Sequence, residues 1–240
     1  MNSVDVCGGG RSGVGACELV TGSRDGTVKL WDPRVAASIA GIVPSQKGPD
    51  CWSVCLGNAF DEANRFLIAG YDNGDLKMFD LRTMTIFWET NVGNGICHVS
   101  FDRNDIAMNK LSVSCLEGQL IVYDMRTFHA KSGFAGVHHT CTKSTVWGCH
   151  PMPQDRDISA VAGGDGSLSL LKYSYPVQRC VKDSDGIDIG VSGTLEQICT
   201  SNNLATQPVV SFDWNADKKG LFAFSSFDQT VKVAVCSNLN

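Results

Sequence analysis

One pattern recurs five times along this 240-residue chain and limits what the chain can fold into. Each copy has a run of alternating apolar and polar residues, a tight turn with an acidic residue and usually a glycine, and a second alternating run. Alternation with a period of two is typical of half-buried strands, and Asp-Gly or Asn-Gly turns accept the positive φ that a two-residue hairpin turn requires. Five β-hairpins are therefore predicted, over residues 18–32, 66–80, 110–124, 158–173 and 220–236.

The spacing of the hairpins indicates a repeat architecture. Their turn glycines, Gly26, Gly74, Gly118 and Gly166, follow one another at intervals of 48, 44 and 48 residues, and the fifth turn at Asp228-Gln229 comes after a longer interval. Repeats of ~40 to 45 residues that end in Trp-Asp resemble WD40 repeats, in which four strands build one propeller blade. The sequence thus predicts an all-β chain, a WD40 β-propeller with about five blades, and one repeat-built domain over residues 1–240.

Each hairpin is expected to form the second and third strands of a blade. The residues around Cys7 look like the end of an inner strand, so the first blade is predicted to be incomplete, and too few residues follow the last hairpin for a fourth strand. These two ends predict an N-terminally truncated part of a seven-bladed propeller. A polar insertion is expected at 176–190. The other strands are predicted at 51–56, 96–101, 145–150 and 209–214 on the inside and near 36–43, 85–90, 133–137 and 193–198 on the outside.

Composition narrows the possible partners and compartments. The net charge of −5 and pI near 5.5 give no overall attraction to a polyanion, so no nucleic-acid partner is expected. No run of residues is long and apolar enough for a membrane span, and the first residues lack the features of a signal peptide. A cytoplasmic protein without membrane association is predicted.

The eleven cysteines predict neither a disulfide framework nor a metal site. No Cys-x-x-Cys occurs, the count is odd, and most cysteines fall in strand-like runs, where a thiol packs as a small apolar group. The nearest approach to a ligand cluster, His138, His139 and Cys141 with Cys149-His150, has irregular spacing for zinc. No cofactor and no metal are expected.

Catalytic motifs are also absent from the sequence, and the acidic residues recur once per repeat instead of gathering in one cleft. An acid in a hairpin turn accepts hydrogen bonds from nearby backbone and hydroxyl groups, a need that every blade shares. We therefore expect a non-catalytic protein. The acids to which this structural role is assigned are Asp25, Asp72, Glu117, Asp165 and Asp228.

A protein-binding surface is predicted on one face of the propeller. The turn between the second and third strands of a blade lies on the same face as the start of the inner strand, and arginine and aromatic residues are common interface anchors. The alternative is that the large aromatic residues pack between blades. The candidate binding residues are Arg24, Trp52, Tyr71, Lys143 and Phe227.

Three repeats end in an aromatic residue, aspartate, a variable residue and arginine. The arginines are Arg34, Arg82 and Arg126. This ending resembles a motif of WD40 substrate receptors of cullin ubiquitin ligases, in which the arginine helps to hold the adaptor. A local structural role, with each arginine paired to an aspartate at a blade corner, is the favoured interpretation.

Several segments resemble one WD40 family more closely than the general repeat. Residues 18–34, 69–75, 88–91, 108–111, 143–147 and 225–231 look like those of the Monad family, also called WD repeat-containing protein 92. This resemblance implies a cytoplasmic adaptor that works with RuvB-like ATPases and a prefoldin-like co-chaperone complex in the pre-assembly of axonemal dynein arms in cilia, with dynein chains as clients. A role in apoptosis is also implied by the resemblance. The ligase substrate receptor is the alternative function.

Overall fold

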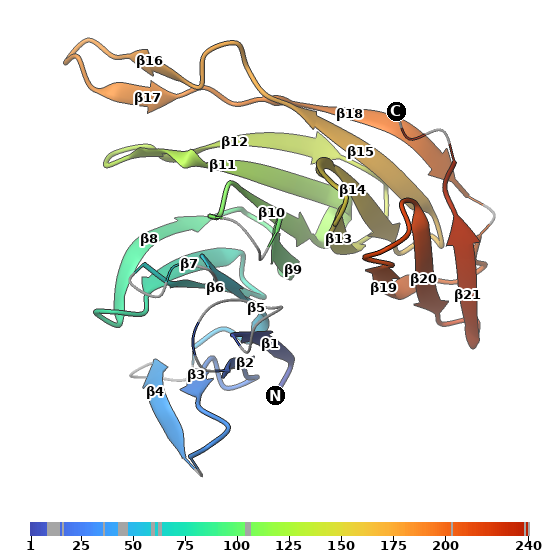
Figure 1. Cartoon of the computed structure of the whole chain (residues 1–240), viewed down its shortest axis with the longest axis horizontal. Coiled ribbons are helices and arrows are strands. Elements are labelled where there is room, and N and C mark those ends of the chain that lie inside the picture. The colour runs from blue at the N-terminus through green and yellow to red at the C-terminus, as the bar shows by residue number, and fades with distance from the viewer. Residues whose placement is uncertain are drawn as a thin grey trace. The chain divides into compact units, whose positions relative to one another are not determined.

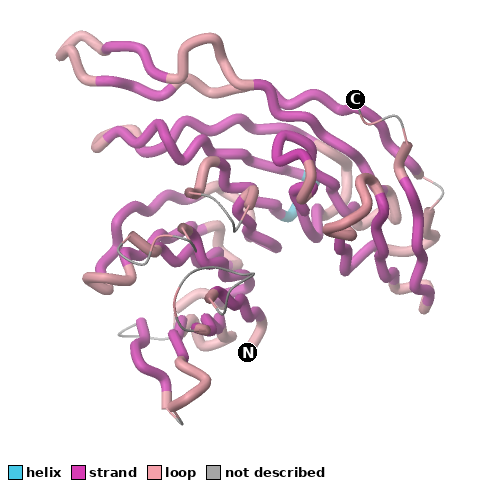
Figure 2. Tube along the Cα trace, viewed as in Figure 1, coloured by secondary structure: helices cyan, strands magenta, loops and turns pink. Residues whose placement is uncertain are grey.

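The computed structural model contains strands connected by turns (Figure 2). It describes residues 1–8, 15, 17–35, 37–42, 48–58, 61, 64–103, 107–202, 204–237 and 239. Within these ranges the one helical element is a single 3-10 turn, Leu116–Gly118. No helix in the described part of the chain has the length and apolar character needed to cross a membrane. The all-β prediction is confirmed.

The chain divides into two compact units, residues 1–108 and 109–240. The first unit contains two four-stranded antiparallel blades, β1-β2-β3-β4 and β5-β6-β7-β8, and then β9, the first strand of the third repeat (Figure 1). Its strands are β1 Ser3–Cys7, β2 Glu18–Gly22, β3 Val28–Trp31, β4 Ser38–Ile42, β5 Cys51–Gly57, β6 Phe66–Tyr71, β7 Asp75–Asp80, β8 Thr85–Asn91 and β9 Ile96–Phe101.

The second unit continues the repeat (Figure 1). Strands β10, β11 and β12 pair in that order, the fourth blade has the order β13-β14-β15-β18, and the fifth has the three strands β19-β20-β21. Strands β16 and β17 form a separate hairpin in the predicted polar insertion. The bounds are β10 Lys110–Cys115, β11 Gln119–His129, β12 Gly133–Thr140, β13 Val146–Met152, β14 Asp155–Gly163, β15 Leu168–Ser174, β16 Cys180–Lys182, β17 Asp188–Gly190, β18 Thr194–Ser201, β19 Val209–Trp214, β20 Leu221–Ser226 and β21 Thr230–Val235.

Five blades are present, as predicted, and the inner and outer strands lie where the sequence placed them. The ends of the predicted first outer strand, Ala36 and Val43, lie outside the described residues. A single domain over 1–240 and membership of a truncated seven-bladed ring stay predictions.

The first blade is complete, which corrects the expectation that its inner strand is missing. Strand β1 pairs with β2 from Ser3↔Gly22 to Cys7↔Glu18. Its polar side chains point toward the next blade, where Ser3 Oγ accepts from Val54 N (3.2 Å) and Asp5 Oδ2 accepts from Leu56 N (2.7 Å). In this strand the polar residues face the neighbouring blade and the valines are exposed. The usual alternation of buried apolar and exposed polar residues is reversed, so the sequence did not predict the strand.

The hairpin turns hold three residues instead of the predicted two. In the first blade Gly26 N donates to Ser23 O (3.0 Å), and Ser23 N donates to Thr27 O (3.0 Å). Only the last turn residue, Gly26 (φ 79°), is left-handed, which is the form of a type I turn followed by a bulge residue. Gly166 (φ 81°) has the same place in the fourth blade, and Gln229 (φ 65°) has it in the fifth.

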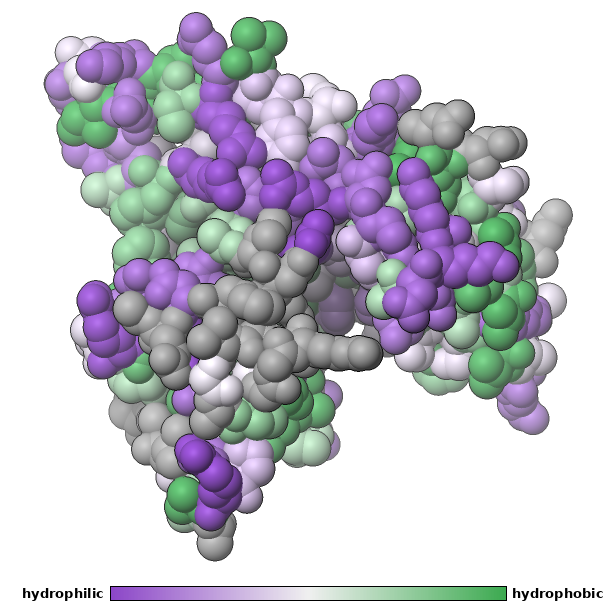
Figure 3. All heavy atoms as spheres, in the orientation of Figure 1, coloured by the Kyte–Doolittle hydropathy of each residue, from purple (hydrophilic) through white to green (hydrophobic). Residues whose placement is uncertain are grey.

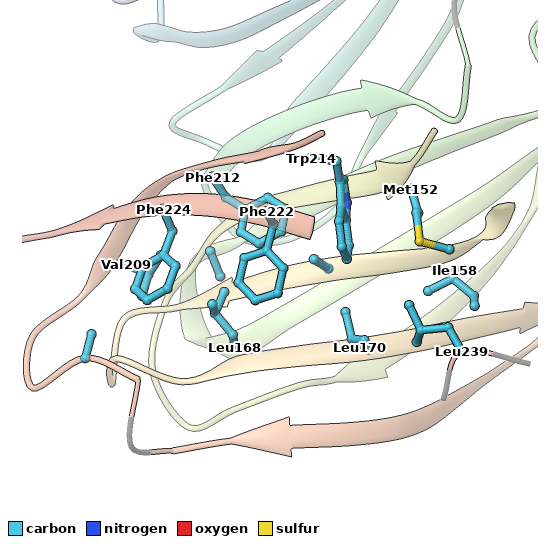
Figure 4. Packing of buried hydrophobic residues seen from close by; sticks show 13 residues of the cluster. Met152, Ile158, Leu168, Leu170, Val209, Phe212, Trp214, Phe222, Phe224 and Leu239 are labelled. Carbon is cyan, nitrogen blue, oxygen red and sulfur yellow. The ribbon is translucent and has the colours of Figure 1, made fainter. Parts of the chain in front are cut away.

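Apolar clusters join neighbouring blades within each unit. In the first unit Val20 and Val28 of the first blade pack with Val54, Leu67 and Phe79 of the second. In the second unit one cluster joins β11 to the fourth blade. A larger one joins the fourth blade to the fifth, and Figure 4 shows its leucines on β15 turned toward the phenylalanine rings of the fifth blade.

Two glycines allow the energetic cost of a left-handed backbone to be measured separately from the cost of a steric clash. Gly166 and Gly186 are both left-handed, at φ 81° and 76°. A Cβ on Gly166 would lie 2.5 Å from Ala205 O, whereas a Cβ on Gly186 meets nothing within 4 Å. We expect Gly186→Ala to cost ~1 kcal/mol for the conformation alone and Gly166→Ala to cost about 3 kcal/mol, measured by denaturant unfolding. Equal losses for the two variants would contradict this account of the fourth turn.

Candidate protein-binding surface

The acids of three hairpin turns make the same pair of hydrogen bonds. Asp25 Oδ1 accepts from Thr27 N (3.0 Å) and Thr27 Oγ1 (2.7 Å), and Asp228 Oδ1 accepts from Thr230 N (3.1 Å) and Thr230 Oγ1 (2.5 Å). Asp165 accepts from the N–H and hydroxyl of Ser167 in the same way. Hydrogen bonds from the threonine hydroxyl and then the backbone lower the pKa of Asp25 to about 2, and the Thr230 hydroxyl is the main cause of the same lowering for Asp228.

In the second turn the position next to the glycine belongs to Asn73, which corrects the assignment of Asp72. Asn73 Oδ1 accepts from Asp75 N (3.0 Å), while Asp72 lies one residue earlier. An asparagine immediately before Gly74 was the signal available in the sequence. Glu117 of the third turn is itself left-handed (φ 60°), as is Gly118 after it, so this turn has a different backbone from the others.

The lowered pKa of Asp228 predicts a pH dependence of stability. Because its folded pKa of about 2 lies below its ordinary value of 3.8, the stabilisation is fully present above about pH 4 and is lost as the pH falls through about 2. The wild-type midpoint should therefore exceed that of Asp228→Asn at pH 5, and the difference should shrink by pH 2. Thermal unfolding from pH 6 to 2 measures this, with the exposed Asp213→Asn as control. A difference that does not change with pH would refute it.

The aromatic-Asp-x-Arg endings differ among the blades. Arg34 Nη2 lies 2.5 Å from Asp32 Oδ2, and Arg82 Nη2 lies 3.4 Å from Asp80 Oδ2. In the third repeat Asp124 is buried and accepts from the backbone N–H of Arg126 (3.0 Å), whose side chain is exposed. The cation beside Asp124 is instead Arg179 of the insertion, with Nε 3.2 Å from Oδ2.

Three of the candidate binding residues lie in the first unit. Arg24 is exposed and its Nε lies 3.6 Å from Asp50 Oδ2. Trp52 is the extra residue of a β-bulge, because Cys51 pairs with Tyr71 and Ser53 with Gly70. Such bulges re-aim a side chain, and Trp52 is half-buried.

Tyr71 is buried, which corrects the expectation of an exposed anchor. It is only 5% exposed and belongs to the apolar cluster between the first two blades. Burial raises the pKa of its hydroxyl, and Lys77 Nζ lies 5.5 Å from the centre of its ring. The residue therefore joins blades and offers little surface to a partner.

In the second unit the exposed candidates are Lys143 and Phe227, which is 63% exposed. Trp147 is a further exposed residue, at 40%, that sequence reasoning did not select. It occupies the same bulge position in β13 that Trp52 occupies in β5, since Val146 pairs with Gly163 and Gly148 with Ala162. The matching place of these two tryptophans in their repeats was the signal that could have found it.

A polar network, buried at Asn109 and Lys110 and partly exposed at Arg179, joins the insertion to the neighbouring strands. The guanidinium of Arg179 stacks 4.2 Å from the centre of the Tyr175 ring, and its Nη2 donates to Asn109 Oδ1 (3.1 Å). Lys110 Nζ donates to Tyr175 Oη and to Asp157 Oδ1, both at 2.6 Å. The network thus bonds the segment just before the hairpin β16–β17 to β10 and β11, and Figure 3 shows a mixture of hydrophilic and hydrophobic side chains over this hairpin, at the upper left.

Arg179 is therefore expected to stabilise the insertion. Arg179→Ala leaves the carboxylate of Asp124 buried without its cation, and we expect a loss of about 2 kcal/mol, below the ~3–5 of a fully buried pair because Arg179 is partly exposed. Hydrogen exchange should speed up in β16 and β17. Arg126→Ala is the matched control and should change neither measurement. Unchanged exchange in Arg179→Ala would contradict this role.

Within the described ranges no three His, Cys, Asp or Glu side chains group closely enough to hold a metal ion. His150 packs against the ring of Phe212, with ring centres 5.3 Å apart, and burial lowers its pKa to about 4. The imidazole is thus neutral at physiological pH. Its position between the fourth and fifth blades is a packing position.

The repeats and the blades define a WD40-repeat protein. The family described as "WD domain, G-beta repeat" matches residues 2–32. Proteins named Dynein axonemal assembly factor 10 from Xenopus laevis and Homo sapiens are 51% identical over 243 residues, and one from Chlamydomonas reinhardtii is 51% identical over 244. Each comparison covers all of this chain and 68% of the relative. The chain belongs to the dynein axonemal assembly factor 10 family.

Proposed function

We propose that this chain is a non-catalytic protein-binding scaffold for the cytoplasmic pre-assembly of axonemal dynein arms. The observation that carries the proposal is the 51% identity over the whole chain to relatives named dynein axonemal assembly factors. Similarity at this level over the whole of this chain favours a shared task as well as a shared fold.

The recurring geometry supports binding in preference to catalysis. Acidic residues in three turns are engaged with the hydroxyl and backbone of their own turns, so they serve the hairpins in which they lie. Exposed side chains at the turns and bulges include Arg24, Lys143, Trp147 and Phe227. Several shallow anchors of this kind suit a protein partner better than a small molecule, which needs one deep pocket.

The proposed partners are a RuvB-like ATPase with a prefoldin-like co-chaperone complex, and dynein chains as clients. The resemblance of residues 18–34, 108–111 and 225–231 to the Monad family supports this choice. The alternative, a substrate receptor of a cullin ubiquitin ligase, draws its support from Arg34 and Arg82, whose side chains are 72% and 67% exposed beside their aspartates.

An affinity purification from ciliated cells distinguishes the two functions. We expect the tagged chain to retain RuvB-like ATPases and dynein heavy chains. Retention of a cullin adaptor, lost in the double variant Arg34→Ala with Arg82→Ala, would favour the ligase receptor and overturn the proposal.

Phe227 gives a test of the binding surface itself. It is 63% exposed, so Phe227→Ala should leave the thermal midpoint unchanged, while loss of a true anchor costs ~2 kcal/mol of binding, or about 30-fold in affinity. The measurement is the amount of ATPase complex retained at a series of concentrations. Val177→Ala, at a fully exposed site in the insertion, is the control. Equal retention by both variants would exclude Phe227 from the surface.

A further inference from the structure

Two cysteines lie on facing sides of the fourth and fifth blades. Cys199 of β18 pairs with Leu170 of β15, and cross-strand partners share a face of a sheet, so Cys199 lies on the face where Leu170 enters the cluster with the fifth blade. Cys236 follows Ala234 at a spacing of two and, like Ala234, packs partly buried against the same cluster. Cys199 of β18 and Cys236, the residue after β21, therefore both lie beside this cluster.

A cavity of about 310 Å³ adjoins both residues. Its apolar lining includes Leu168, Leu170, Phe212 and Phe222, which Figure 4 shows between the two blades, and both cysteines line it as well. Burial of the Cys236 thiol, followed by the charge of the nearby Cys199, raises the pKa of Cys236. Both side chains thus open onto the same cavity between the fourth and fifth blades.

Access to the two thiols is unequal. Cys199 is exposed, whereas Cys236 is partly buried. An oxidant from solution thus meets Cys199 first and finds a second thiol beside it. An accessible thiol with a second thiol nearby that can resolve its oxidised form is often found at redox-sensor cysteines.

We propose that Cys199 and Cys236 form a redox-sensitive dithiol, a modification site that oxidised glutathione or a peroxide converts to a disulfide between the fourth and fifth blades. With peroxide, the Cys199 thiolate attacks one oxygen and becomes a sulfenic acid as the O–O bond breaks, releasing one water after proton uptake. The Cys236 sulfur then attacks the Cys199 sulfur, forming the S–S bond and releasing a second water. The two thiols lose two protons and two electrons in all, and the peroxide takes them up.

The disulfide would tie the fifth blade to the fourth. It closes a loop over 37 positions of sequence, which restricts the unfolded chain and raises stability in the oxidised form. Because a cytosolic glutathione pool keeps most thiols reduced, the dithiol is the resting form and the disulfide the response to oxidative stress.

The test begins with the reduced full chain treated with oxidised glutathione, followed by non-reducing digestion and mass spectrometry. We expect one intramolecular link between the peptides of Cys199 and Cys236, with a mass two hydrogens below the sum of the reduced peptides. The thermal midpoint should rise by roughly 10 °C, and dithiothreitol should reverse both changes.

Variants separate this pair from the other cysteines. Cys199→Ser and Cys236→Ser should each abolish the link and the midpoint shift. Cys141→Ser should keep the link and the midpoint shift. Cys141 lies near Cys149, which is buried away from oxidants, so these two cysteines are not expected to form a link of their own. Phenylarsine oxide, which binds paired thiols, gives a measurement on the unaltered chain, and one arsenical bridging this pair is expected.

A glutathione adduct on Cys199 with Cys236 left as a free thiol would overturn the proposal, since it would show that the sulfur atoms do not reach each other. A link between two chains, seen as a dimer on a non-reducing gel, would overturn it as well.

Discussion

The hydrogen bond from a turn acid to the residue two positions later is the constraint on which the rest of the structure depends. In the first, fourth and fifth blades it fixes Asp25, Asp165 or Asp228 against the start of the third strand, and Asn73 replaces the acid in the second. With the turn fixed, the register of the hairpin follows, and a slip of one residue would turn every apolar side chain to the wrong face. The apolar clusters between blades exist only because these registers hold.

Much of this arrangement could be predicted from the sequence because it is local. Alternation and turn residues lie within ~15 positions of each other, so they reveal the hairpins, the outer strands and the three-stranded fifth blade. Strand β1 was missed because Ser3 and Asp5 face inward, where their side chains bond to the backbone of β5. These two inward-facing side chains find their hydrogen-bond partners in a strand about 50 residues later in the sequence. No local pattern can indicate such a distant partner.

In the candidate surface, too, the exposure of some residues follows from local sequence and that of others depends on distant parts of the chain. Exposure of Arg24 and Phe227 follows from their places in the turns. The burial of Tyr71 depends on packing between the first two blades, and the aiming of Trp147 depends on a bulge that an alternating pattern does not show. Arg179 takes the place beside Asp124 that sequence spacing gave to Arg126, because the chain returns through the insertion after some 50 residues.

Neighbouring blades are held together both by hydrogen bonds from side chains and by apolar clusters. Where Ser3 Oγ and Ser53 Oγ accept backbone N–H groups of Val54 and Val99, each bond fixes one strand against the next in a single register. Between the fourth and fifth blades a large apolar cluster is combined with hydrogen bonds from Trp214 Nε1 to His150 O (2.9 Å) and from Gln154 Nε2 to Asn215 O (2.8 Å). Because Cys199 and Val235 in the lining of the cavity are exposed, part of the apolar surface at this joint stays in contact with water and adds no stabilisation from burial. Those two hydrogen bonds lie at β13, β19 and the turns that follow them, so a covalent link from Cys199 of β18 to Cys236 adds a restraint at the outer strands.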